Sequence, residues 1–181
     1  EVGQQVAVQW RSAGLTEDHT WALINAGGAT VDNWLYDRYR SAGSSTYFTN
    51  AVDRSGVTDP APEAVYQTYS YASYGVGNRL VYAIPLPDGD YDVRLHFVEP
   101  SYGSAGSRQF DINLQGVTVV AGYDIYVATG ALYEATTVSA AGVTVAGGLG
   151  LDVELVNTTY VGAVLSAIEI TQHSAGGVAE P

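Results

Sequence analysis

The residues best suited to chemistry in this chain are the acids near its middle. Asp88, Asp90 and Asp92 alternate along the sequence, and Glu99 falls at the twelfth position counted from Asp88. This is the spacing of a calcium-binding EF-hand loop. Such a loop needs glycine at its sixth position, where Val93 stands, and a helix on each side. We therefore predict a turn followed by a strand and no metal site here, although calcium ligands could still come together from distant loops.

Glu99 is also the best candidate for acid–base work on a sugar. Glycosidases use two carboxyl groups that flank the scissile bond, and no partner for Glu99 is evident. The histidines, His19, His96 and His173, include no close pair and no HExxH motif, so no zinc site is predicted. No GxSxG motif marks a nucleophilic serine, and His96 is interpreted as a polar strand residue. We expect no catalytic residue, no cofactor and no enzymatic activity.

Tyrosine is the overrepresented residue, with 14 copies against 3 phenylalanines and 3 tryptophans. A tyrosine ring offers a flat apolar face and a polar tip, which suits it to stacking on sugars. Tyrosine is also common in strands for reasons of packing alone. Both interpretations stay open from composition.

One strand must position many of these groups, because residues 89–99 alternate strictly. Tyr91, Val93, Leu95 and Phe97 lie on one face, and the polar residues between them face the other way. We predict that the apolar face is buried.

Further short segments, separated by glycines and turn residues, predict roughly ten strands and no amphipathic helix. They are residues 21–24, 65–71, 79–84, 110–114 with 117–120 as a hairpin, 123–127, 131–138, 143–146, 149–156 and 164–171. Residues 32–62 are polar and form either a long loop or several short strands. The pattern predicts an all-β single domain, a jelly-roll-like β-sandwich over residues 22–171. Residues 1–21 are expected to be a lead-in or linker, and residues 172–181 a tail.

The charge balance excludes two classes of partner. The chain of 181 residues has 19 acids, 7 arginines and no lysine, for a net charge of −12. Nucleic acids and anionic membranes both require a basic surface. No apolar run approaches the roughly 20 residues of a membrane helix, so no membrane insertion is expected. The absence of cysteine excludes disulfides and thiolate sites.

Two further motifs are weak. Residues 147–150 are glycine-rich but lack a following lysine, so a hairpin turn is predicted rather than a phosphate loop. Asn157, Thr158 and Thr159 form a glycosylation sequon, which matters only in a host that modifies such sites.

An ordered set of short motifs resembles the malectin and malectin-like family over residues 22–171. The motifs are Asn25-Ala26-Gly27-Gly28, Trp34-x-x-Asp37, Tyr66-Gln67-Thr68 with Tyr71, Pro87-x-Gly89-x-Tyr91, Leu95-His96-Phe97-x-Glu99, Arg108-x-Phe110-Asp111, Tyr123-Asp124-Ile125 with Gly130, and Ser166 to Ile170. The resemblance implies a β-sandwich that binds carbohydrate through aromatic loop residues at one end. The chain departs from the family pattern at Ser101 and at Tyr69 with Ser70. It also departs near Tyr160, because the family has an acid at that place and this chain has none.

By that resemblance, Trp34, Tyr71 and Tyr102 supply stacking platforms that line one sugar-sized depression. Asp37 and Glu99 supply hydrogen-bond acceptors. The structural alternative makes Trp34 a core residue and pairs Glu99 with Arg108, and for Arg108 this alternative is preferred.

These expectations lead to a non-catalytic carbohydrate-binding module of a larger secreted or cell-surface protein, with an oligo- or polysaccharide as partner. The alternative is a structural or adhesive module of an extracellular assembly, whose tyrosines pack against other domains or subunits. A small glycosidase is the third possibility and lacks an acid pair.

Overall fold

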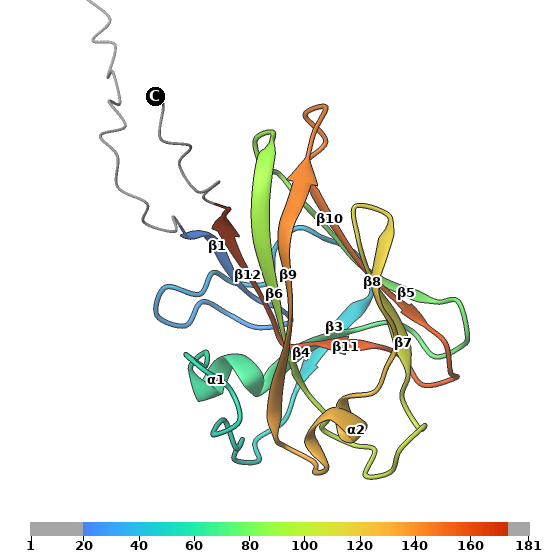
Figure 1. Ribbon diagram of the computed structural model, residues 1–181. Helices are drawn as coiled ribbons and strands as arrows, with labels where there is room; N and C mark the ends of the chain where they lie inside the picture. Colours follow the sequence, from blue (N-terminus) through green and yellow to red (C-terminus); the bar gives the residue numbers. More distant parts are fainter. Residues whose placement is uncertain (1–19, 174–181) are drawn as a thin grey trace, which may run out of the picture.

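The computed structural model describes residues 20–173. Within them the strands are β1 (Thr20–Asn25), β2 (Arg40–Ala42), β3 (Ser44–Tyr47), β4 (Thr68–Tyr71), β5 (Arg79–Ile84), β6 (Gly89–Val98), β7 (Phe110–Leu114), β8 (Val117–Tyr123), β9 (Ala135–Val145), β10 (Leu151–Asn157), β11 (Val164–Leu165) and β12 (Ala167–Gln172). Two short helices interrupt them, α1 (Glu63–Tyr66) and α2 (Ile125–Thr129) (Figure 1). The all-β prediction is confirmed.

The strands form two large antiparallel sheets that face each other, with a smaller third sheet at one end. The large sheets have the orders β1-β12-β6-β9 and β2-β5-β10-β7-β8, and the small sheet has the order β11-β4-β3. The main core lies between the large sheets and includes Leu95 and Phe97 of β6 opposite Leu80 of β5 and Leu155 of β10. The apolar face predicted for residues 91–97 is therefore buried, and the hairpin of β7 and β8 forms as expected.

A second, smaller core lies on the other face of β6. It contains Trp34, Val52, Val57, Ala61, Val65, Tyr66, Val98, Ala135 and Ala167. The segment between β3 and β4, including α1, supplies most of these residues, so it covers the end of β6 that precedes Glu99.

Two segments predicted as strands are partly helical. Residues 65–71 begin as the last turn of α1, whose Val65 and Tyr66 are buried in the second core, and only β4 is extended. Residues 123–127 lead from β8 into α2. Asp124 caps this helix by accepting from the backbone N–H of Val127 at 3.1 Å, and Gly130 ends it with a φ of 85°.

Residues 131–138 and 143–146 were expected as separate strands, but residues 135–145 form one strand, β9. An irregularity in its pairing with β6 lies between Tyr91 and Val93. There Gly142, at a φ of 65°, donates its N–H to Asp92 at 2.8 Å. This bulge lets β9 continue, because glycine tolerates the left-handed conformation.

The three alternating aspartates accept hydrogen bonds at turns and strand edges. Asp88 accepts from the backbone N–H groups of Gly147 and Gly148, and Asp90 accepts from the Thr144 hydroxyl. No group of three or more possible metal-ligating side chains occurs in residues 20–173. The turn-and-strand interpretation of residues 88–99 is confirmed.

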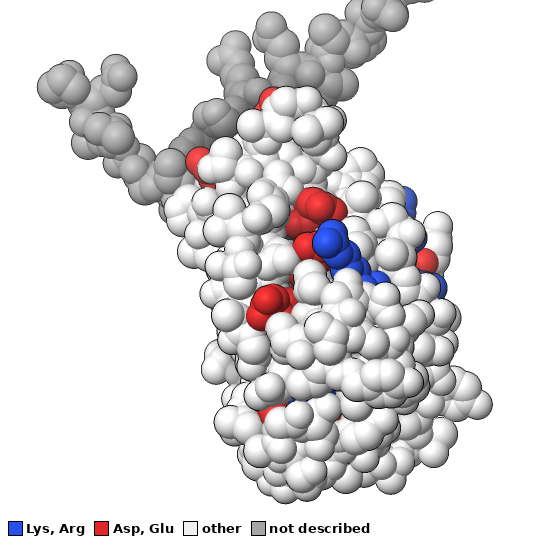
Figure 2. Space-filling view, turned by 90° about the vertical axis from the view of Figure 1, so that its right-hand side faces the viewer, with Lys and Arg blue, Asp and Glu red and all other residues white. Residues whose placement is uncertain are grey.

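The face of the molecule in Figure 2 carries no basic patch. In Figure 2 most of the visible face is uncharged, and the arginines shown lie close to acids. Among the described residues, Arg79 forms an ion pair with Glu154 at 2.7 Å. In the described part of the chain, neither helix has the length or apolarity to cross a membrane. The predicted lead-in and tail, with His19, lie almost entirely outside the described residues.

Candidate ligand-binding site

A depression of about 260 Å³ opens where the small sheet meets the loops at its end of the domain. Its lining comes from four parts of the chain: β3, β4 with the loop after it, the β6–β7 loop, and the β10–β11 loop with β11. The lining residues are Thr46, Tyr69, Tyr71, Ala72, Tyr74, Ser101, Tyr102, Arg108, Gly162 and Val164. Four of the ten are tyrosines, and none carries a carboxylate.

Two of the tyrosines reach the depression because β4 alternates. Tyr69 and Tyr71 lie on one face of the strand, and the intervening Ser70 is buried on the other. Their rings are 6.2 Å apart between centroids and tilted by 56°. Burial raises the pKa of Tyr69 above its usual value of 10. Its hydroxyl can donate and accept hydrogen bonds.

Beneath the depression, Glu99 and Arg108 form a buried ion pair. The Arg108 Nε donates to Glu99 Oε2 at 2.7 Å, and Nη2 donates to Oε1 at 3.2 Å. Glu99 Oε1 also accepts from the backbone N–H groups of Ser101 and Tyr102, each at 3.0 Å. Glu99 is 1% exposed, and both of its carboxylate oxygens accept hydrogen bonds from the β6–β7 loop. The structural alternative for this pair is confirmed.

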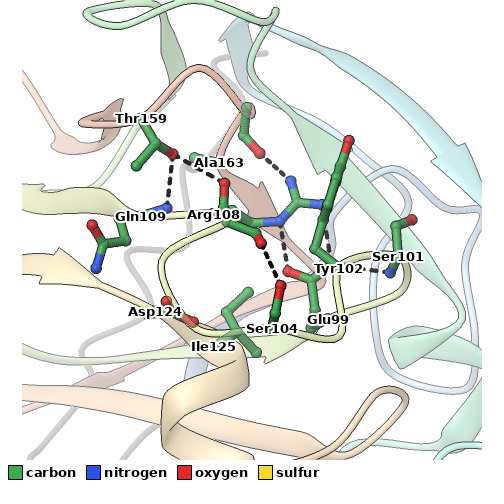
Figure 3. Close-up of polar contacts among 12 residues, drawn as sticks. Glu99, Ser101, Tyr102, Ser104, Arg108, Gln109, Asp124, Ile125, Thr159 and Ala163 are labelled. Atoms are coloured by element: carbon green, nitrogen blue, oxygen red, sulfur yellow. Dashed lines mark hydrogen bonds and ion pairs between the residues drawn. The ribbon is translucent and has the colours of Figure 1, made fainter.

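The ion pair fixes the position of Tyr102. Figure 3 shows the Tyr102 ring over the guanidinium of Arg108, whose carbon lies 5.1 Å from the ring centroid. A third Arg108 nitrogen donates to the carbonyl of Gly162, which ties the β6–β7 loop to the β10–β11 loop. The Tyr102 hydroxyl lies 3.2 Å from that of Tyr74. This hydrogen bond is the main reason that the pKa of Tyr102 is raised.

Asn157 joins the loops from within. Its side-chain nitrogen donates to the carbonyls of Ser73 at 2.8 Å and Gly75 at 2.9 Å, and its oxygen accepts from the N–H of Ala163 at 2.7 Å. Asn157 is 1% exposed. The sequon at this position therefore presents no free amide in the folded domain, and its asparagine holds the Tyr74 loop.

Asp37 is part of the support below β4. It accepts from the Tyr82 hydroxyl at 2.7 Å and from the Arg40 Nε at 3.0 Å, and the Ser70 hydroxyl lies 3.4 Å away. Burial, and next the charge of Asp37, raise the pKa of Tyr82, which therefore stays a donor. Asp37 does not line the depression.

Trp34 lies in the second core. It is 5% exposed, and its ring lies nearly perpendicular to the His96 ring, at 88°, with a centroid distance of 5.3 Å. His96 Nδ1 shares a hydrogen bond with the Tyr66 hydroxyl at 2.8 Å. The other ring nitrogen, Nε2, lies 3.3 Å from the Glu169 carboxylate. The alternative that makes Trp34 a core residue is confirmed.

The structure thus brings together two of the five predicted site residues, Tyr71 and Tyr102, with Glu99 directly below them. The sequence analysis missed Tyr69 and Tyr74 as lining residues. The alternation of Tyr69 with Tyr71 was the available signal, since residues two apart on a strand share a face.

The comparisons with known proteins agree on the fold. The chain is similar to the ANX2 ectodomain from Arabidopsis thaliana, with 20% identity and a TM-score of 0.74, covering 87% of this chain and 50% of that one. It is similar to the ANXUR1 extracellular domain from Arabidopsis thaliana, with 20% identity and a TM-score of 0.71, covering 90% and 51%. A chain of the structure described as the plant peptide RALF23 in complex with FER and LLG2 matches at 19% identity and a TM-score of 0.72, covering 87% of this chain and 49% of that one.

The chain therefore spans about half the length of these solved structures. No curated protein sequence matches it. The sequence model described as the malectin domain matches residues 20–168, nearly all of the described part. By this match the chain belongs to the malectin domain family.

Proposed function

We propose that this domain is a non-catalytic carbohydrate-binding module of a larger secreted or cell-surface protein, and that the tyrosine-lined depression is its sugar site. The observation that carries the proposal is the meeting of Tyr69, Tyr71 and Tyr74, from β4 and the loop after it, with Tyr102 of the β6–β7 loop in one depression. In this arrangement Tyr71 and Tyr102 keep the ligand-binding role expected from the sequence.

Sugar chemistry matches this lining. A pyranose ring has apolar C–H faces that pack on aromatic rings, and hydroxyls that need polar partners of fixed orientation. Tyrosine supplies both, since its hydroxyl donates and accepts. Thr46 and Ser101 add polar groups to the same lining.

The environment of Glu99 supports a binding role rather than hydrolysis. A glycosidase needs one carboxyl group that stays protonated and another that stays ionised. Glu99 is held by Arg108 and two backbone N–H groups, and no second acid lines the depression. The lining therefore contains neither the protonated carboxyl group nor the ionised one that a glycosidase needs.

The family and the solved relatives support a place outside the cell. The ANX2 and ANXUR1 chains are ectodomains or extracellular domains, and this domain corresponds to about half of each. An oligo- or polysaccharide of the cell surface or its surroundings is the expected partner.

A second candidate function is the binding of a peptide or of neighbouring domains. Tyr36, Tyr47 and Tyr160 are exposed, and exposed aromatic residues also serve protein interfaces. The FER chain of one similar structure is in complex with a peptide. In this case the tyrosines would pack against protein.

A glycan array followed by titration of the best hit separates the two candidates. Tyr71→Ala is expected to weaken sugar binding about tenfold, because one stacked ring contributes roughly 0.5–1.5 kcal/mol beyond the area that it buries. Tyr36→Ala is the matched control: Tyr36 is 54% exposed and lies outside the lining. Equal binding by the parent and Tyr71→Ala, with unchanged melting, would move the site elsewhere. A blank array together with peptide binding would favour the second candidate.

A further inference from the structure

We propose that the sugar site continues beyond the depression onto Tyr160, which stacks a further ring of the same uncharged oligosaccharide chain. This inference rests on the proposed function and extends it to the class of ligand: a linear, neutral chain rather than a single terminal sugar.

The observation is a pair of stacked tyrosines at the rim. The rings of Tyr74 and Tyr160 are 5.6 Å apart between centroids, and their planes differ by only 5°. The two residues come from different loops and are 58% and 71% exposed. A stacked pair that served packing alone would be expected in a core, where burial of its faces contributes most.

The pair is continuous with the depression. Tyr74 belongs to the lining, and its hydroxyl lies 3.2 Å from the Tyr102 hydroxyl. Tyr102, Tyr74 and Tyr160 therefore follow one another from the depression outward. A chain that occupies the depression and leaves it past Tyr74 meets Tyr160 next.

The two loops are held in place before any ligand arrives. The N–H of Gly75 donates to the carbonyl of Tyr160 at 2.7 Å, and Asn157 bonds the carbonyls of Ser73 and Gly75 from below. A platform that is already ordered loses little conformational entropy on binding, which favours affinity.

The surroundings of the pair select an uncharged ligand. Residues 72–78 and 157–163 contain no Asp, Glu, Lys, Arg or His. The charge of Arg108, at the base of the depression, is already matched by Glu99. An acidic sugar or a charged peptide would find no counter-charge along this path, whereas a neutral chain loses nothing.

The test is a titration of the protein with linear oligosaccharides of increasing length, built from the sugar of the best array hit. The parent is expected to gain affinity once the chain is long enough to reach Tyr160. Tyr160→Ala should remove that gain, roughly two- to tenfold, and leave the affinity for the shortest ligand unchanged. Tyr160→Phe should keep the gain, because the ring face makes the contact. The hydrogen bond from Gly75 uses the backbone of Tyr160 and survives both changes.

Two outcomes would overturn the inference and leave the proposed function standing. One is a parent affinity that does not change with chain length while Tyr71→Ala still weakens binding. The other is an equal fractional loss for short and long ligands in Tyr160→Ala, which would make Tyr160 a brace for Tyr74. Binding of no sugar at all would instead remove the proposed function, and this inference with it.

Discussion

Two aromatic clusters flank the end of β6, and only one of them is open. Trp34 and Tyr66 surround His96, with Glu169 beside it, on one side. Tyr69, Tyr71, Tyr74 and Tyr102 surround the depression above Glu99 and Arg108 on the other. Both combine aromatic rings with an acid, so composition does not tell them apart.

The difference lies in what covers each cluster. Residues between β3 and β4, including α1, close over the Trp34 cluster and bury it in the second core. The tyrosine cluster is bounded by the β4–β5, β6–β7 and β10–β11 loops, which line a depression instead of closing it. The same residue types therefore contribute to stability where they are covered and are free for a ligand where they are not.

The sharpest test of this contrast is Trp34→Ala. Removing a buried tryptophan should lower the free energy of unfolding by about 3–5 kcal/mol, because it leaves a cavity next to His96. Sugar affinity should be unchanged in the folded fraction. Denaturant unfolding measures the first quantity, and titration below the melting temperature measures the second. Loss of sugar affinity at full stability would return Trp34 to the site.

The next largest loss of stability is expected in the open region, from Glu99→Gln. The variant leaves Arg108 charged and buried without its partner, which typically costs about 3–5 kcal/mol. The double variant Glu99→Gln with Arg108→Met should recover part of the loss, since no unpaired charge remains. Chemical denaturation of the parent and both variants makes the comparison. A single variant as stable as the parent would show that the pair does not hold the Tyr102 loop.

Asn157→Ala should have a smaller effect, about 1–3 kcal/mol, because it leaves the carbonyls of Ser73 and Gly75 and the N–H of Ala163 without partners. It should also weaken sugar binding through the displaced Tyr74 loop. Amide hydrogen exchange of residues 72–78 and 158–163 checks the local effect. Unchanged exchange in both loops would argue that Asn157 does not join them.

The smallest effect is the pH dependence of the covered cluster. Burial lowers the pKa of His96 below its usual 6.5, and the hydrogen bond from His96 lowers the pKa of Glu169 below 4.5. As the pH decreases below 6.5, His96 takes up a proton in the unfolded chain before it does so in the folded chain. The free energy of unfolding therefore decreases as the pH is lowered. The Glu169 contribution, present above pH 4.5, is lost as pH falls further. The slope from His96 is at most about 1.4 kcal/mol per pH unit.

The variant His96→Gln should flatten that slope below pH 6.5, whereas His173→Gln, in an exposed pair with Asp92, serves as the control. Denaturant titrations at several pH values give the slopes. An identical slope in the parent and His96→Gln would assign the acid sensitivity to other groups.

Some features followed from local pattern. Alternation at Tyr91 to Phe97 was enough to identify the buried face of β6, because a strand places every second residue on the same side. Asp124 and Gly130 were visible signals of a capped helix, although residues 123–127 were predicted as a strand. Ordered motifs were enough to indicate the family, which the match over residues 20–168 shows.

The site itself depended on contacts between distant segments. Glu99 meets Arg108, and Arg108 meets Gly162, across loops that no periodicity relates. Trp34 lies in a turn-rich segment whose sequence suggests exposure, yet it is buried in the second core with residues from the segment 52–66. The sequence by itself determined the all-β class, the inward face of β6, the β7–β8 hairpin and the supply of tyrosines. Only the tertiary structure decided which aromatic rings are covered, because burial depends on which loops close over a strand and not on the residues of the strand itself.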